Sequence, residues 1–68
     1  MNEYTITVLD TDTYIERRIA VQASSAQQAH KDALWELNDL ESEQITRVVN
    51  EHGQLVYTSD DGFLNLTT

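Results

Sequence analysis

The segment SSAQQAHKDALWELNDLESE, residues 24–43, is the stretch of this chain that shows a sustained helical period. Ser24 or Ser25 can cap a helix, because a serine hydroxyl accepts a hydrogen bond from the free amides of the first turn, and Gln27 or Gln28 can complete a capping box. Apolar residues fall on one side of the expected helix: Ala26, Ala29, Ala33, Leu37 and Leu40. This spacing predicts one helix over residues 24–43 that packs through a single apolar stripe.

Acidic residues form a second stripe beside the apolar one: Asp32, Glu36, Asp39 and Glu43. Like charges at these spacings destabilise a helix by a few tenths of a kcal/mol per pair, so their retention indicates a binding partner. Their steps of about 5–6 Å along the helix also resemble the phosphate spacing of a nucleic-acid strand. The alternative is an ordinary surface helix that is rich in acids.

Trp35 lies nearly opposite the apolar stripe, and we therefore expect it to be exposed. An exposed tryptophan flanked by carboxylates is typical of an interface anchor, because tryptophan contributes strongly to binding energy. The alternative is that Trp35 folds back over the C-terminal tail and is structural. The expected partner-binding residues on the helix are thus Trp35 and the four acids.

Short strands are expected on both sides of the helix. Alternating polar and apolar residues, separated by turn-forming residues, predict strands at 3–9, 14–23, 44–50 and 55–57, and residues 63–66 either add a final strand or dock as a tail. Arg17 interrupts the apolar face of the second strand. Either a bulge shifts the alternation there, or the strand end overhangs the helix and the guanidinium reaches water.

The order strand, strand, helix, strand, strand predicts an α+β domain, β-β-α-β-β, that spans residues 1–68. A right-handed crossover places the third strand beside the first, giving an antiparallel-rich sheet of order 2-1-3-4 with the helix on one face. The inward faces of two strands and the helix define the expected core: Ile6, Val8, Ile19, Val21, Ala29, Ala33, Leu37 and Leu40.

Twelve acidic and four basic residues give this 68-residue chain a formal charge of −8. Such a charge disfavours DNA, RNA and anionic membranes as ligands, so the expected partner is a protein with a basic surface. The alternative is that the charge serves solubility alone. The sequence has no cysteine, no apolar run long enough to span a membrane and no signal-peptide pattern, which fits a cytoplasmic protein.

The polar residues show no catalytic pattern, and we expect neither an enzyme nor a cofactor. Clustered carboxylates at Asp10 and Asp12, and at Asp60 and Asp61, have the chemistry of a divalent-cation site. They lack the spacing of a calcium loop, and turn formation accounts for them better. We therefore expect no metal.

The order of elements resembles small phage-encoded inhibitors of host systems, and above all a β-β-α-β-β anti-CRISPR protein that acts on type I surveillance complexes. The resemblance spans most of the chain, through Ser25, Ala29 and Ala33, then Ile45, Arg47 and Val48, then Gly53, Tyr57 and the turn at 60–62. Most of that family's basic and polar contact residues have no counterpart here, and the strong acidity differs from it.

A second resemblance is to a podophage inhibitor of bacterial RNA polymerase. It covers residues 23–35, with Ala29, Ala33 and Trp35 at matching spacing, and then Thr46, Arg47 and Val48. That family has a further basic residue two positions after the one matching Arg47, where this chain has Val49.

Together the resemblances imply a phage or mobile-element protein that inhibits a host nucleic-acid-handling complex, in the first place a CRISPR effector, in the host cytoplasm. Its acidic helix face would occupy a basic nucleic-acid groove, with Arg47 as a further contact, and it would not bind nucleic acid directly. We expect a monomer or a weak homodimer. The alternative from another class is a small structural or assembly module that self-associates.

Overall fold

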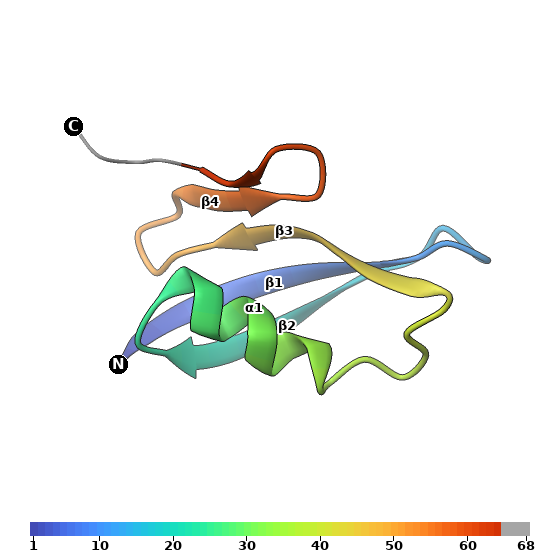
Figure 1. The fold of residues 1–68 in the computed structure, drawn as a ribbon, viewed down its shortest axis with the longest axis horizontal. Coiled ribbons are helices and arrows are strands. Elements are labelled where there is room, and N and C mark those ends of the chain that lie inside the picture. The colour runs from blue at the N-terminus through green and yellow to red at the C-terminus, as the bar shows by residue number, and fades with distance from the viewer. Residues whose placement is uncertain (65–68) are drawn as a thin grey trace.

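The computed structural model describes residues 1–64, which form one antiparallel sheet and a single helix. The elements are β1 (Asn2–Asp10), β2 (Glu16–Ala23), α1 (Ala26–Leu34), β3 (Glu43–Val49), β4 (Leu55–Thr58) and β5 (Gly62–Phe63) (Figure 1). The sheet order is β2-β1-β3-β4-β5. The predicted α+β class and the order of the first four strands are confirmed, and β5 extends the sheet by a short strand. Part of the predicted segment 63–66 lies outside the described residues.

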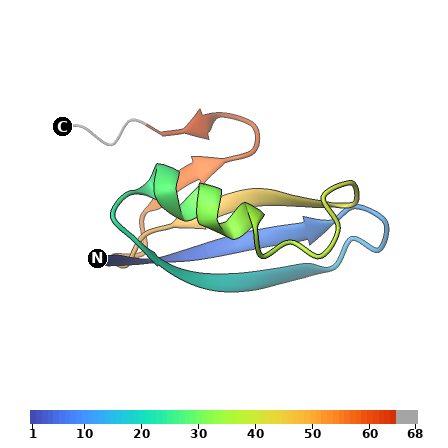
Figure 2. The same cartoon turned by 60° about the horizontal axis from the view of Figure 1, so that its bottom comes forward.

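The helix lies on one face of the sheet (Figure 2), and it contacts β2, β1 and β3. Its start is as predicted, since the Ser25 hydroxyl accepts a hydrogen bond from the Gln28 amide at 3.1 Å. The Gln28 side chain instead binds the Asp32 carboxylate at 2.8 Å, so the capping box is not completed. The expected helix end is wrong, because α1 stops at Leu34 after nine residues.

The core lies between α1 and the central strands, β1 and β3. Of the expected core, Ile6, Val8, Ala29 and Ala33 are buried, while Ile19, Val21 and Leu37 pack against them partly buried. Leu40 is a wrong prediction, because it is 71% exposed beyond the end of the helix. The buried set also includes Tyr4, Ala23, Ile45, Val48 and Val56. Ile45 and Val48 face the same side because the β1–β3 register shifts between Thr7 and Val8.

The last two strands are tied to the helix by an aromatic cluster. The His30 ring lies 4.6 Å from the Tyr57 ring and 5.6 Å from the Phe63 ring, centroid to centroid. Burial lowers the pKa of His30, because a charged imidazole loses hydration between these rings. The neutral ring therefore serves as an apolar contact between α1 and the β4–β5 hairpin.

The β1–β2 hairpin contains a backbone irregularity at Tyr14. The Tyr14 amide donates to the Asp10 carbonyl at 2.7 Å, while the Asp10 amide donates to the Ile15 carbonyl at 3.0 Å. These bonds close a four-residue loop, residues 11–14, and its last residue, Tyr14, is left-handed with φ of 59°. Glycine is the usual residue there, so a tyrosine carries a conformational cost.

Replacing Tyr14 by glycine should therefore raise the free energy of unfolding by about 1 kcal/mol, which is about 4–8 °C in melting temperature for a domain of this size. Tyr14→Ala is the matched control, since it removes the same exposed ring but keeps the left-handed penalty. Thermal melts of the three proteins measure the effect. A glycine variant no more stable than the alanine variant would contradict the backbone account.

Candidate functional site: an acidic end with an apolar groove

The acids predicted to share one helix face lie on three different elements. Asp32 is in α1, Glu36 and Asp39 are in the connection between α1 and β3, and Glu43 is the first residue of β3. The predicted helical ladder is therefore wrong. After Leu34 the backbone continues through tight turns, in which the Trp35 amide donates to the Asp32 carbonyl and the Glu36 amide to the Ala33 carbonyl.

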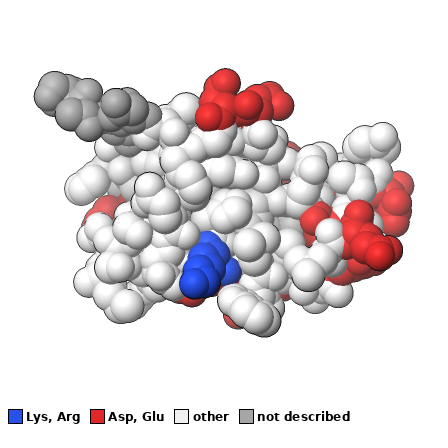
Figure 3. Space-filling model, viewed as in Figure 1, with Lys and Arg blue, Asp and Glu red and all other residues white. Residues whose placement is uncertain are grey.

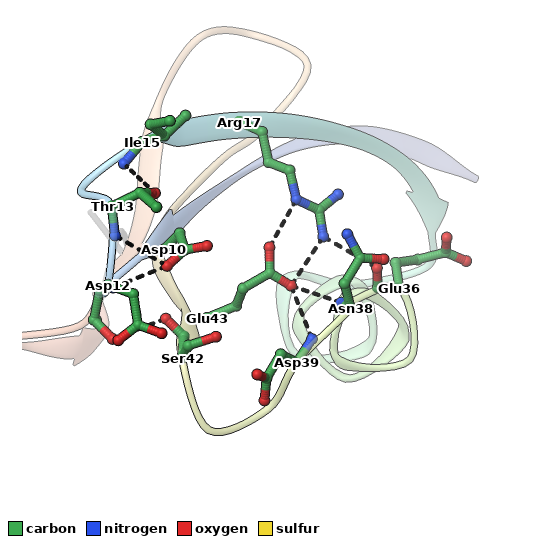
Figure 4. Close-up of polar contacts among 11 residues, drawn as sticks. Asp10, Asp12, Thr13, Ile15, Arg17, Glu36, Asn38, Asp39, Ser42 and Glu43 are labelled. Carbon is green, nitrogen blue, oxygen red and sulfur yellow. Dashed lines mark hydrogen bonds and ion pairs between the residues drawn. The ribbon is translucent and has the colours of Figure 1, made fainter.

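Glu43 holds the connection that follows the helix. Its carboxylate accepts hydrogen bonds from the Asn38 amide at 2.6 Å and the Asp39 amide at 3.2 Å, which holds the connection in a turn. It also accepts from Arg17 Nε at 3.0 Å, and Arg17 Nη2 donates to the Glu36 carbonyl at 3.2 Å (Figure 4). The Glu43 side chain is only 7% exposed, and its oxygens are engaged in these internal contacts.

Arg17 resolves the two alternatives for the second strand. The pairing of β2 with β1 runs without a register shift from Glu16 to Ala23, so no bulge lies at Arg17. The second alternative holds in part: the guanidinium reaches past the helix end at Leu34, but there it meets the Glu36 carbonyl and the Glu43 carboxylate as well as water. Its main partner is the Glu43 carboxylate, although 38% of the side chain remains exposed.

The Arg17 hydrogen bond lowers the pKa of Glu43, and the two backbone amides lower it further. Because the folded-state pKa lies below the unfolded one, the charged Glu43 stabilises the fold fully above the ordinary glutamate pKa of about 4.3. That stabilisation is lost as the pH falls through the lowered pKa, where the folded state also takes up the proton.

Glu43→Gln should thus melt below the parent at pH 7, and the difference should shrink as the pH falls below about 4.3. Glu41→Gln is the matched control, because it removes one charge from an exposed neighbour in the same connection. Thermal melts of the three proteins from neutral to acidic pH decide the result. Equal melting temperatures for the parent and Glu43→Gln at pH 7 would show that the Glu43 contacts do not hold this connection.

The tip of the β1–β2 hairpin is fastened to the same connection. The Thr11 amide and hydroxyl both donate to the Ser42 carbonyl, at 2.6 and 2.9 Å. Asp10 shapes the tip, since its carboxylate accepts from the Asp12 and Thr13 amides at 2.9 and 3.3 Å. These local bonds agree with the turn interpretation of the aspartates, and Figure 4 shows them beside Glu43.

The hairpin tip and the connection together bring acidic side chains to one end of the molecule. We call this surface the acidic end and define it by Asp10, Asp12, Glu36, Asp39 and Glu41. Figure 3 shows acidic side chains gathered there and a second group near the β4–β5 turn. Of the four acids expected to share one surface, only Glu36 and Asp39 lie at this end, while Asp10, Asp12 and Glu41 join them through the fold.

A shallow apolar groove of about 300 Å³ adjoins the acidic end and is lined by Lys31, Leu34, Trp35 and Leu40. Trp35 is 83% exposed, which confirms that it faces outward. Glu36 follows Trp35 in the chain, and Asp39 and Glu41 flank Leu40. Exposed apolar side chains with a charged rim are the arrangement of a protein interface, in which the centre is dehydrated and the rim stays in water.

Two of the expected contact residues lie elsewhere. Asp32 is half-buried on α1, where its carboxylate accepts from Gln28. Arg47 lies on β3, and its side chain lines a hollow on the sheet face opposite the helix. A single flat partner surface therefore cannot contact both Arg47 and Trp35.

Among residues 1–64, no group of three or more potential metal ligands comes together. In the same part of the chain, no helix is long and apolar enough to cross a membrane. Comparison with protein-family models, with curated proteins and with solved structures finds no match to this chain.

Proposed function

We propose that this chain is a phage or mobile-element inhibitor that binds a host nucleic-acid-handling complex, in the first place a type I CRISPR surveillance complex. It acts by occupying a basic groove and performs no chemistry. The observation that carries the proposal is the apolar groove around Trp35 with the acidic end at its rim. The choice of target rests on the resemblance to the β-β-α-β-β anti-CRISPR family.

The two parts of this surface have different tasks in binding. Exposed carboxylates and a net charge of −8 attract a basic surface over several ångströms and raise the association rate. Trp35 and Leu40 then lose water against the partner, and such apolar anchors determine how long the complex lasts. A groove that binds nucleic acid provides the basic surface, whereas nucleic acid itself is repelled by the acids.

Inhibition of bacterial RNA polymerase remains a second candidate of the same kind. The resemblance behind it includes both Trp35 and Arg47, and these lie on opposite sides of the sheet. An inhibitor of that type would use one of them or wrap a protruding part of its target.

Self-association is the candidate from another class, and two observations favour it. The outer side of β2 is paired with no other strand among residues 1–64. The groove at Trp35 also offers apolar surface to a second copy. Sedimentation of the purified chain over a wide concentration range tests this: a stable dimer that Trp35→Ala dissociates supports the module, and a monomer throughout supports the inhibitor.

A phage-plating assay tests the inhibitor proposal in cells that carry an active type I CRISPR system with a matching spacer. Expression of the parent chain should restore plaques, and Trp35→Ala or the double variant Glu36→Lys/Asp39→Lys should not. The double variant Asp60→Lys/Asp61→Lys is the control. It changes the net charge by the same amount, from −8 to −4 at two units per residue, at residues that do not line the groove. Plaques that stay absent with the parent chain expressed would refute this target.

A further inference from the structure

The face of the sheet opposite the helix carries a row of residues in register across three strands. Thr7 of β1 pairs with Arg18 of β2 on one side and with Arg47 of β3 on the other. Thr7 is only 4% exposed although no helix among the described residues covers this face, since the two arginine side chains flank it. The row thus presents two guanidinium groups on either side of a threonine.

A hollow of about 460 Å³ opens at this row, and its lining has a polar and an apolar part. Thr5, Thr7 and the two arginines supply hydroxyl and guanidinium donors, while Val49 and Leu55 supply apolar surface. The chain has four Lys and Arg residues, so half of its basic side chains meet here. Of the others, Arg17 is engaged by Glu43 and Lys31 lies beside Trp35.

The chain's own Glu16 shows which chemical group this row attracts. Its carboxylate approaches Arg47 Nη2 at 3.6 Å, and both side chains are about half exposed, at 47% and 48%. Exposed ion pairs at such distances contribute little, so an incoming carboxylate can replace Glu16 at small cost. Arg18 has no ion-pair partner within the described part of the chain.

We infer that the Arg18–Thr7–Arg47 row binds an extended acidic peptide, with a carboxylate on the arginines and an apolar side chain on Val49 and Leu55. Arginine forks bind carboxylates through paired charge-assisted hydrogen bonds. Alternate side chains of an extended peptide lie about 7 Å apart on one side, the same step that separates Arg47 from Val49 along β3. The fitting motif is therefore an acidic residue and an apolar residue two positions apart.

The lining favours a peptide over a nucleic-acid strand. No aromatic side chain lines the hollow, so bases would have no surface on which to stack. A net charge of −8 repels a polyanion, whereas a peptide has to bring only one carboxylate. This site lies on the other side of the sheet from Trp35, so a negative result here would not count against the proposed function.

The test is a nuclear magnetic resonance titration of the isotope-labelled full chain with a blocked seven-residue peptide. The peptide holds Glu and Leu two positions apart among Ser and Thr residues. We expect saturable shifts of the amides of Thr7, Arg18, Arg47 and Val49. Arg18→Gln or Arg47→Gln should weaken binding about tenfold, as loss of a charge-assisted hydrogen bond does. Glu16→Gln should strengthen binding only slightly, because it removes a weak internal competitor.

Matched variants separate these effects from net charge. Gln27→Glu changes the net charge by the same amount as Arg18→Gln, and Asp60→Asn changes it by the same amount as Glu16→Gln. Gln27 and Asp60 are exposed and do not line the hollow. Equal weakening by Gln27→Glu, or weaker binding with Glu16→Gln than with Asp60→Asn, would overturn the site. The site would also be overturned if a peptide with Gln in place of Glu bound equally well. The same holds if acetate or inorganic phosphate alone gave equal shifts, or if an octathymidylate bound more tightly than the peptide.

Discussion

Replacing Ile6 by alanine is expected to lower the free energy of unfolding by about 2–5 kcal/mol, which is a large share of what a domain of this size has. Ile6 is fully buried at the centre of β1, where it pairs with Ile19 of β2 and Val48 of β3. Alanine would remove buried methyl groups from all these contacts and leave a cavity. Because the core is small, few neighbouring side chains can move to fill it.

Ile15→Ala is the matched control for this prediction, since it makes the same chemical change at a residue that is 66% exposed. Surface substitutions of this kind usually stay within about 0.5 kcal/mol of the parent. Urea unfolding of the three proteins provides the comparison. Similar midpoints for Ile6→Ala and Ile15→Ala would mean that the core does not lie between β1 and α1.

The second large effect is expected at the acidic end. Glu36→Lys with Asp39→Lys should slow association with the target and flatten its dependence on salt, since steering by exposed charges is screened at high ionic strength. Trp35→Ala should mainly raise the dissociation rate. The loss in binding free energy should be about 2 kcal/mol or more if the ring is a dehydrated anchor. Trp35 and Glu36 are exposed, so neither variant should lower the melting temperature much.

Surface plasmon resonance at several salt concentrations separates these two effects, with Asp60→Lys/Asp61→Lys as the charge-matched control. The control should associate faster than Glu36→Lys/Asp39→Lys although both have the same net charge. Equal association rates for the two double variants would show that only the net charge affects association and that the acidic end does not steer it. Unfolding of the Trp35→Ala variant would show that the ring is structural.

The sheet and the start of the helix could be predicted because local sequence determines them. The alternation of Tyr4, Ile6 and Val8 requires only a strand with one buried face, and Ser25 acts on an amide three residues away. Turn residues are equally local, and Gly53 takes a positive φ of 79° between the strands expected at 44–50 and 55–57. These elements were sufficient to order the first four strands.

The end of the helix could not be predicted from the same kind of signal. Leu37 and Leu40 continue the apolar period, and neither glycine nor proline interrupts it. Beyond the helix end at Leu34, the Glu43 carboxylate accepts from the Asn38 and Asp39 amides and is itself held by Arg17, 26 residues earlier, so these amides are engaged outside a helix. Such a contact exists only once the sheet has formed, and it leaves the acids of the predicted ladder on α1, the following connection and β3.

The Arg18–Thr7–Arg47 row could not be predicted from the sequence for a related reason. Arg47 was singled out in the sequence, but its neighbours depend on the register of three strands and on the irregularity between Thr7 and Val8. Periodicity assigns a residue to a face and does not say which residue lies opposite it on the next strand. The sequence therefore pointed to one basic residue where the fold presents two.

Competition between this chain and target DNA for a purified type I surveillance complex is the most direct test of the acidic end as a nucleic-acid-groove inhibitor. The complex is incubated with the chain at saturation, and binding of its matching DNA duplex is then measured. We predict that the parent chain and Asp60→Lys/Asp61→Lys block DNA binding, while Trp35→Ala and Glu36→Lys/Asp39→Lys block it weakly. Undiminished DNA binding in the presence of saturating parent chain would contradict the proposal.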